Sequence, residues 1–437
     1  MLTTGVVWLV VGCFAFLFFL IIWGVPVAIS MLVSAMVGMI ILTGSFKPGV
    51  HILTYTLQIL ATTHSYIVIP LFVLMGALAG TTGVAADFFK AANKLVGRIR
   101  GGLGIAVCFA SAAFGALTGS TVSSTIIMTK VALPELKKFN YQSSFSLGII
   151  ASASTLAAMI PPSIMLVVYA ILTEQSVGKL LVGGIVPGIM QAAIYSLFIW
   201  ARASLQPGLA PRGQRYSLGE SLRSLKDIIP LVGTLLGVMF GILFGLWTPV
   251  EGGAIGAITI ALYGLLRRRL KATEVRDAGV ETASTCGIIF ILIVGSICFS
   301  KFLAASGVTE MLISAVIAMN VSPFVFFLML LGAFTVLGCF IEGIAMEALS
   351  LPILMPVILM FGWDPVWFGI IMTKLVQVAT LTPPVGLNLY ALKSAAPNEN
   401  FTDIARGCLP FWTLEWGILL LLYFVPQIVL WLPSMTG

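Results

Sequence analysis

The sequence predicts an all-α integral membrane protein with an inverted-topology repeat, two re-entrant helical hairpins and two helices broken at Pro-Pro pairs. Three observations support this fold class. The 437-residue chain is 59% hydrophobic and 9% charged, with a mean hydropathy of +1.10. Pro-Pro occurs twice inside long apolar stretches, at 161–162 and at 383–384. Basic residues gather in a few short segments between apolar stretches.

The composition indicates a chain that crosses the membrane many times. A soluble globular protein carries roughly 25% charged residues, and many apolar stretches here approach the ~20 residues of a membrane-spanning helix. The first stretch, 1–24, lacks a basic n-region and a clear cleavage site. We therefore expect a retained membrane helix and not a secretory signal. The net charge of +7 is typical of cytoplasmic loops, so we expect no nucleic-acid partner.

The residues of thiol and metal chemistry form no motif. Six cysteines are scattered in apolar surroundings without a CxxC pair, which indicates packing. The two histidines, His51 and His64, form no HExxH motif, which argues against metalloprotease chemistry. We expect a chain that is not an enzyme and that has no organic cofactor.

An offset of 222 residues aligns the two halves of the chain. It places Pro161 on Pro383, Ile149 on Ile371 and Ala157 on Ala379. Around these positions the order of features is also shared: an apolar segment, a short amphipathic stretch, two apolar arms around a glycine-rich point, and a helix that ends at Pro-Pro. Chance is a poor explanation for the whole series, so we predict an internal repeat.

Basic residues predict how the repeats are oriented. Two basic clusters flank the helices expected at about 227–246 and 251–266, which places both clusters in the cytoplasm and the intervening "WTPVEGG" outside. The clusters are Arg202, Arg212, Arg215, Arg223 and Lys226, and Arg267, Arg268, Arg269, Lys271 and Arg276. Counting membrane crossings from these anchors places the N-terminus outside and the two halves in opposite directions.

Two segments are predicted to enter and leave the membrane on the same side. Segment 102–134 has basic residues before and after it, and its middle, "GALTGSTVSST", is small and polar. We expect a re-entrant hairpin from the cytoplasm. Segment 321–360 has no basic residue at either end and carries "LGCFIEGIAMEAL" at its centre, so we expect a hairpin from the outside. Non-helical backbone at such depth is tolerated only inside protein or beside a watery cavity.

The broken helices, 141–173 and 365–395, predict two Na⁺ sites. A proline leaves the carbonyl four residues earlier without its helical partner, so the first pair frees the carbonyls of Ala157 and Ala158 and the second those of Ala379 and Thr380. Neutral hydroxyl and carbonyl ligands favour Na⁺ over a proton relay, whereas a plain proline kink is the alternative. The predicted ligands are Gly119, Ser120, Ser124, Thr155, Ala157, Ala158 and Ser163 at the first site and Gly338, Gly343, Ala379, Thr380, Thr382, Gly386 and Asn388 at the second.

Charges inside apolar segments predict a site for a small organic anion. Intramembrane charges are usually functional or paired. Lys374 has three possible roles: it binds a substrate carboxylate, it neutralises Glu342 or Glu347, or it snorkels into a watery cavity. The hydroxyls and N–H groups at the first hairpin tip suit an anionic group. The predicted substrate residues are Ser120, Thr121, Ser123, Glu342 and Lys374.

The phrases "IPPSIMLVVYAILTEQSVGKL" and "LTPPVGLNL" carry a resemblance that covers nearly the whole chain. The chain resembles the large membrane subunit of tripartite ATP-independent periplasmic (TRAP) transporters, the DctM-like family. The resemblance implies sodium-coupled import of a carboxylate that a periplasmic binding protein delivers. It also implies a partner membrane subunit of about four helices, a multi-pass location in the inner membrane, and both chain termini on the periplasmic side.

The same resemblance implies an elevator-type mechanism and a division of the chain into four segments. The mobile transport domain comprises 101–205 and 320–437. It moves against a scaffold made of 1–100 and 206–319.

Three other functions are compatible with parts of the sequence. The first is a stand-alone sodium/anion symporter or exchanger, which needs no binding protein. The second is an intramembrane enzyme, for which no histidine lies near the Ser120–Ser124 hydroxyls. The third is a passive channel, which leaves the paired broken helices unexplained.

Overall fold

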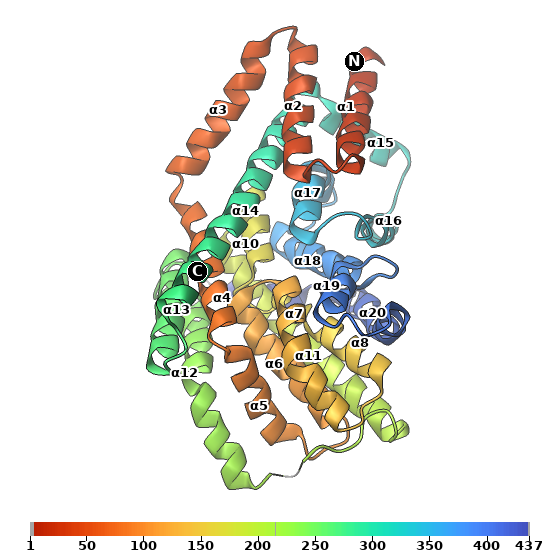
Figure 1. Cartoon of the computed structure of the whole chain (residues 1–437). Helices are drawn as coiled ribbons and strands as arrows, with labels where there is room; N and C mark the ends of the chain where they lie inside the picture. The colour runs from red at the N-terminus through yellow and green to blue at the C-terminus, as the bar shows by residue number, and fades with distance from the viewer. Residues whose placement is uncertain (1–3, 215, 436–437) are drawn as a thin grey trace.

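The computed structural model describes residues 4–214 and 216–435, and every regular element in this part of the chain is a helix (Figure 1). Arg215 of the basic cluster and the chain ends, whose side of the membrane was predicted, lie outside the described residues. The helices of the first half are α1 (Thr4–Ile22), α2 (Val27–Thr43), α3 (Phe46–Thr62), η1 (His64–Ile67), α4 (Val68–Thr81), α5 (Val84–Val96), α6 (Gly102–Thr118), α7 (Thr121–Lys138), α8 (Ser143–Ala153), α9 (Leu156–Met159), α10 (Ile164–Leu172) and α11 (Val177–Leu205).

The described residues of the second half also form α-helices and one short 3-10 helix. Its members are α12 (Leu218–Leu243), α13 (Pro249–Leu266), α14 (Ala272–Ser306), α15 (Val308–Ala318), α16 (Pro323–Leu337), α17 (Gly343–Met360), α18 (Pro365–Leu381), α19 (Leu387–Ala395), α20 (Phe401–Phe424), α21 (Gln427–Leu430) and η2 (Pro433–Met435). Among the described residues, 7 helices are long and apolar enough to cross a membrane, or up to 10 if each bent pair is one span. The predicted multi-pass membrane protein is confirmed at this level.

Segment 102–134 forms two helices, as predicted. Gly119 and Ser120 join α6 to α7, and the two arms pack against one another. Gly119 has a φ of +60°, a conformation that a glycine adopts without a Cβ clash. Ser120 then caps α7, because its hydroxyl accepts a hydrogen bond from the Ser123 N–H at 3.3 Å. The helical pair is thus confirmed, and its re-entrant path through a membrane stays a prediction.

The second pair has a different geometry. Helices α16 and α17 diverge: in Figure 1, α16 is seen end-on while α17 stands upright. The arm α16 packs against α18, whereas α17 packs against α14, α18 and α10. Glu342 caps α17, where its carboxylate accepts a hydrogen bond from the Ala345 N–H at 3.3 Å. Segment 321–360 is therefore two helices with separated arms and not a close hairpin.

Both predicted helix breaks are confirmed at the proline pairs. The first separates α9 from α10, and the helix bends by 42° between Ser143–Met159 and Ile164–Leu172. The second ends α18 at Leu381, and α19 resumes at Leu387. Hydroxyls stabilise the restarted helix of the first break, where Ser163 accepts a hydrogen bond from the Leu166 N–H at 3.4 Å.

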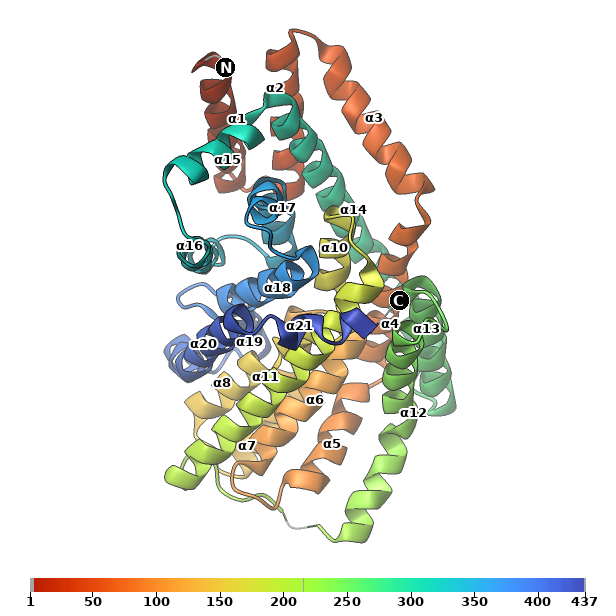
Figure 2. The same ribbon diagram turned by 180° about the vertical axis from the view of Figure 1, so that it is seen from behind.

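The two halves of the chain interlock in the centre of the molecule. Helix α8 packs along α20, and α11 packs along α18, so each contact joins a first-half helix to a second-half helix (Figures 1 and 2). A Cβ on Gly148 would lie 2.0 Å from the Gly407 carbonyl oxygen, and a Cβ on Gly407 would lie 1.9 Å from that of Ser144. Such small residues allow helix backbones to touch, which is a common way to pack helices within membranes.

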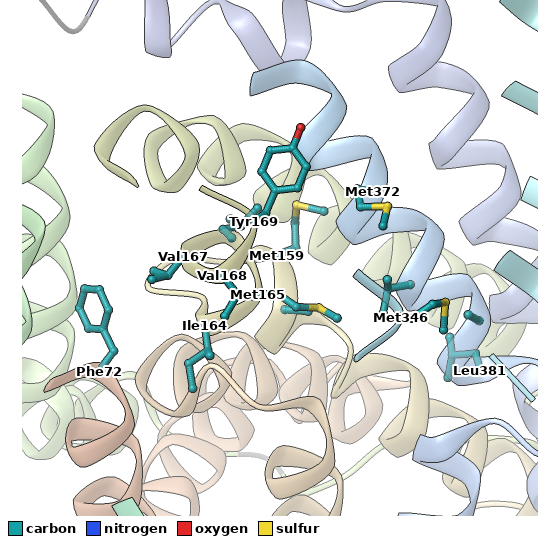
Figure 3. Close-up of a cluster of buried hydrophobic side chains, with 14 of the residues drawn as sticks. Phe72, Met159, Ile164, Met165, Val167, Val168, Tyr169, Met346, Met372 and Leu381 are labelled. Carbon is teal, nitrogen blue, oxygen red and sulfur yellow. The ribbon is translucent and has the colours of Figure 1, made fainter. Parts of the chain in front are cut away.

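A methionine-rich cluster fills the space between the breaks. Met159, Met165, Met346 and Met372 come from α9, α10, α17 and α18, and all four are buried (Figure 3). Methionine is unbranched and fills irregular gaps between elements. The broken helices therefore share a packed apolar contact in this region.

Candidate functional site

A cavity of about 20 Å³ lies where the ends of both helical pairs meet both breaks. This volume is enough for one water molecule or one small ion. Its wall includes the first residue of α7, the cap of α17 and residues beside each proline pair. The polar or break-forming residues of the wall are Thr121, Ala158, Glu342, Gln377 and Thr380.

Matched glycines bring each helical pair against a break. A Cβ on Gly115 would lie 2.7 Å from the Ala157 Cα, and a Cβ on Gly338 would lie 2.3 Å from the Ala379 Cβ. Ala157 and Ala379 are 222 positions apart, which is the offset that aligns the two proline pairs. Because a side chain at either glycine would displace the break, these contacts set the distance between tip and break.

Most residues of the first predicted Na⁺ site are buried, but some of their oxygens already take part in hydrogen bonds within the protein. The Ala158 carbonyl accepts a hydrogen bond from the Ser163 hydroxyl at 2.6 Å, and the Thr155 hydroxyl donates to the Ser152 carbonyl at 2.7 Å. The Ser124 hydroxyl is buried and has no hydrogen-bond partner among the described residues. The expectation that the Ala158 carbonyl is bare is therefore wrong, although a carbonyl oxygen has a second lone pair for an ion.

In the second predicted Na⁺ site, some of the candidate oxygens likewise already take part in hydrogen bonds. The Ala379 carbonyl accepts from the Thr382 N–H at 3.2 Å, so it too is not bare. The Thr380 hydroxyl donates to the Gln377 carbonyl at 3.0 Å. Asn388 is completely buried, and its Oδ1 has no hydrogen-bond partner among the described residues. The Gly386 N–H donates to the Thr382 carbonyl at 2.8 Å, which closes the turn after the prolines.

The predicted substrate residues are divided between two cavities. Thr121 and Glu342 line the small central cavity. Ser120 and Ser123 instead line a cavity of about 370 Å³ between α4, α7 and α14, together with Glu281 and three threonines. Adjacent positions at a helix start point in different directions, so the "GSTVSST" hydroxyls do not converge on one point.

Lys374 is not paired with Glu342 or Glu347, and its role in substrate binding stays a prediction. Its ammonium forms an ion pair with Glu415 of α20, and it also donates to Gln377 Oε1 at 2.7 Å. The side chains of Lys374 and Glu415 are 1% and 0% exposed. The expected pairing with Glu342 or Glu347 is wrong, and Lys374 lines neither cavity.

A buried polar network surrounds this ion pair and joins the two halves. Gln191 Nε2 donates to Glu415 at 2.5 Å, and the Tyr195 hydroxyl donates to the same carboxylate. Gln377 Nε2 donates to the Thr155 carbonyl at 2.9 Å. The network therefore links α11, α18 and α20 to the turn between α8 and α9 in the first half. Thr155 and Gln377 are themselves 222 positions apart, so equivalent positions of the two halves touch here.

Glu415 was missed although the sequence contains a signal for it. It lies inside the apolar stretch of α20, where a lone carboxylate meets the same criterion that selected Lys374. Lys301 in α14 was missed in the same way, and its ammonium lies 4.1 Å from the ring centroid of Tyr55. A search of every apolar helix for charged side chains finds both Glu415 and Lys301.

A second ion pair lies outside the apolar segments. The Glu399 carboxylate, in the loop before α20, accepts hydrogen bonds from the Lys137 ammonium at the end of α7 and from the Ser143 hydroxyl at 2.7 Å. The hydrogen bond from Lys137 lowers the pKa of Glu399 below its ordinary value. This contact fastens the end of α7 to the second half.

Comparison with known proteins places nearly the whole chain in one family. The model of the family "Tripartite ATP-independent periplasmic transporter, DctM component" matches residues 14–428. The chain is 31% identical over 395 residues to the C4-dicarboxylate TRAP transporter large permease protein DctM of Pseudomonas aeruginosa, covering 90% of this chain and 92% of that one. It is 28% identical over 423 residues to the isethionate TRAP transporter permease protein DctMQ of Oleidesulfovibrio alaskensis, covering 94% of this chain and 64% of that protein.

A solved structure shares the fold at low sequence identity. The Alcanivorax borkumensis YdaH transporter superposes with a TM-score of 0.59 at 15% identity, covering 86% of this chain and 87% of that one. A likeness at this identity concerns the fold alone.

Proposed function

Because the chain belongs to the DctM component family of tripartite ATP-independent periplasmic transporters, we propose that it imports a small organic acid in symport with Na⁺. As a large permease of this family it is a multi-pass membrane protein that acts with a substrate-binding protein and a small membrane subunit. The finer parts of the proposal are the sodium coupling, the location in the inner membrane, the periplasmic termini and the elevator motion of 101–205 and 320–437 against 1–100 and 206–319.

The single observation that carries the sodium proposal is the central cavity. It is large enough for an ion, and the polar residues Thr380, Gln377 and Glu342 are part of its lining. Hard cations such as Na⁺ prefer oxygen ligands of this kind. The unpartnered buried oxygens of Ser124 and Asn388 beside the two breaks are further candidate ligands.

Two features support a moving transport domain. The interlocking contacts α8 to α20 and α11 to α18 tie the two predicted mobile segments into one body. The cavity of about 370 Å³ lies between that body and α4 and α14 of the predicted scaffold. Ser120 and Ser123 reach this cavity, which is large enough for a small organic acid. The substrate would then contact both parts and be released when they slide.

The need for a small membrane subunit and a binding protein distinguishes the proposed transporter from a stand-alone symporter. The relative named DctMQ is longer than this chain, which covers 64% of it. This length is consistent with a small subunit fused to the large one in that protein. For this chain we propose separate subunits, namely a four-helix membrane protein and a periplasmic binding protein.

Sodium binding can be tested without knowing the substrate. The melting temperature of the purified chain in detergent should rise when Na⁺ replaces K⁺ at constant ionic strength, because a ligand that binds only the folded state stabilises it. Thr380→Val removes the hydroxyl that lines the cavity and should weaken the apparent affinity for Na⁺. The matched control Thr413→Val removes an exposed hydroxyl on α20 and should leave that affinity unchanged.

Transport is then measured in vesicles that contain all three components. An inward Na⁺ gradient should drive uptake of succinate or isethionate, and removal of the binding protein should abolish it. Equal melting in Na⁺ and K⁺ together with uptake that ignores Na⁺ would refute the sodium part of the proposal. Uptake that persists without the binding protein would favour the stand-alone symporter.

A further inference from the structure

Glu347 is a buried carboxylate that nothing in the described part of the chain stabilises. It lies on α17, five residues after the cap Glu342, and its residue is 0% exposed. Neither of its carboxylate oxygens has a hydrogen-bond partner among the described residues. It also has no place in the ion pairs found in the described part of the chain.

The elements that pack against α17 offer no counter-charge to this carboxylate. They are α10, α14, α15, α18 and α2. On α10, Tyr169 is the one ionisable residue, and its hydroxyl donates to the Pro365 carbonyl at 2.7 Å. On α18, Lys374 is committed to Glu415. On the adjoining part of α14 the ionisable residues are Cys298, which contacts Thr56, and Lys301, which lies over Tyr55.

The remaining neighbours are acidic or apolar. Glu310 on α15 is an exposed carboxylate, and α2 has no ionisable side chain. Glu342, at the start of the same helix, is the charged group that acts on Glu347, and it too is negative. Next to Glu347 in sequence, Met346 belongs to the buried methionine cluster (Figure 3). An ionised carboxylate at this position has repulsion and no attraction.

A proton satisfies this position better than a metal ion does. An unpaired ionised group is strongly destabilised by burial, so the neutral form is favoured. Na⁺ would need several oxygen ligands and space for itself, and Glu347 lines neither the small central cavity nor the larger cavity beside α4 and α14. A proton needs a single oxygen atom, and one of the two Glu347 oxygens provides it.

We propose that Glu347 is a proton-binding site on the mobile arm of the second helical pair, which takes up and releases one proton as that arm changes its exposure. In the packed arrangement seen here the carboxyl group carries the proton. The site lies five residues from the exposed cap Glu342 beside the central cavity, or roughly 7.5 Å along the helix at 1.5 Å per residue.

The proton step is simple and balanced. On one side of the membrane the Glu347 carboxylate forms an O–H bond with a proton from water. On the other side that bond breaks, and the proton returns to water while the carboxylate regains its charge. No other bond changes. The coupling of this step to uptake rests on the proposed transport function, whereas the protonation of Glu347 does not.

Infrared difference spectroscopy tests the protonation directly on the purified full chain. At neutral pH the parent should show the stretching band of a protonated carboxyl group, and that band should be missing in Glu347→Gln. Glutamine matches the shape of the protonated side chain, so the variant should fold. The control Glu310→Gln removes an exposed carboxylate and should leave the band unchanged. A parent without the band, or a band that persists in Glu347→Gln, overturns the proposal.

Currents after a pH jump test proton movement without any substrate. Proteoliposomes with the parent chain should show a transient charge displacement after a jump in external pH, and Glu347→Gln should lose it. If Glu347→Gln does not fold, Glu347→Asp keeps a carboxyl group and should shift the infrared band in frequency. An unshifted band in Glu347→Asp overturns the proposal.

The two proposals fail in different ways. Loss of the Na⁺ effects with an intact Glu347 band would refute the sodium symport alone. Intact Na⁺ effects with no Glu347 band would refute the proton site alone.

Discussion

Glu415 and Glu347 are both completely buried, yet the protein treats them in opposite ways. Glu415 has an ion pair with Lys374 and hydrogen bonds from Gln191 and Tyr195. Glu347 has no partner among the described residues. The partners of Glu415 fix the arrangement of α11, α18 and α20. The unpartnered Glu347 carboxylate instead destabilises the present packing of α17. Burial alone therefore does not identify a functional charge. The ion pairs and hydrogen bonds of the buried group show whether it has a structural role.

The largest expected effect follows from removing the charge of Glu415. Glu415→Gln leaves the Lys374 ammonium buried without a counter-charge, which should lower the free energy of unfolding by ~3–5 kcal/mol. Denaturation midpoints in detergent measure this loss. The double variant Lys374→Met with Glu415→Met should recover most of the stability, because an apolar pair of similar size replaces the ion pair. A Glu415→Gln chain that unfolds at the parental midpoint would break the comparison.

Removing one neutral partner of Glu415 should have a smaller effect. Tyr195→Phe deletes the hydroxyl that donates to this carboxylate, and a hydrogen bond to a charged group contributes about 1.5–3 kcal/mol. The same denaturation measurement applies. Tyr390→Phe is the matched control, because Tyr390 is half exposed. Equal midpoints for Tyr195→Phe and Tyr390→Phe would show that the Tyr195 hydroxyl does not help to hold Glu415.

Replacing Glu347 should change stability in the opposite direction. Glu347→Met removes an unsatisfied buried polar group and should raise the free energy of unfolding by about 1–3 kcal/mol at neutral pH. The gain would be accompanied by loss of the proton-dependent current. A destabilised Glu347→Met chain would mean that the carboxyl group has a partner after all, and the contrast with Glu415 would disappear.

The smallest effect is expected for the ion pair outside the apolar segments. The pKa of Glu399 is lowered by the hydrogen bond from Lys137, so its contribution to stability is present above pH 4.5 and is lost as the pH falls through the lower folded-state pKa. Because Lys137 is half exposed, the contribution should be about 0–1 kcal/mol. In Glu399→Gln the loss of stability between pH 4.5 and pH 3 should be correspondingly smaller than in the parent. An identical pH profile would show that the contact contributes nothing.

The sequence predicted those features that depend on local chemistry. The breaks at Pro161 and Pro383 follow from a missing N–H, and the tip at Gly119 follows from a glycine beside a capping serine. The offset of 222 residues also located Ala157 and Ala379 before their contacts with glycines were seen. The inverted orientation of the halves and the division into scaffold and transport domain remain predictions.

The features that were missed depend on tertiary contacts. Lys374 pairs with Glu415, 41 positions later, through a helix crossing that no local pattern specifies. Ser120 and Thr121 line different cavities because the rotation of α7 against its neighbours, and not the sequence, decides where each points. The Ala158 and Ala379 carbonyls were expected to be bare, but Ser163 reaches the first across its break and the Thr382 N–H binds the second at the end of α18.

The interlocking of the two halves has a consequence for biosynthesis. Gln191 and Tyr195 leave the ribosome long before their partner Glu415, which lies 224 residues after Gln191. At about 5–20 residues per second, this polar pair waits roughly 10–45 s inside or beside the membrane before its carboxylate arrives. The Thr155 carbonyl waits in the same way for Gln377. A nascent first half is thus an incomplete folding unit, whose core closes only when the last long helix is inserted.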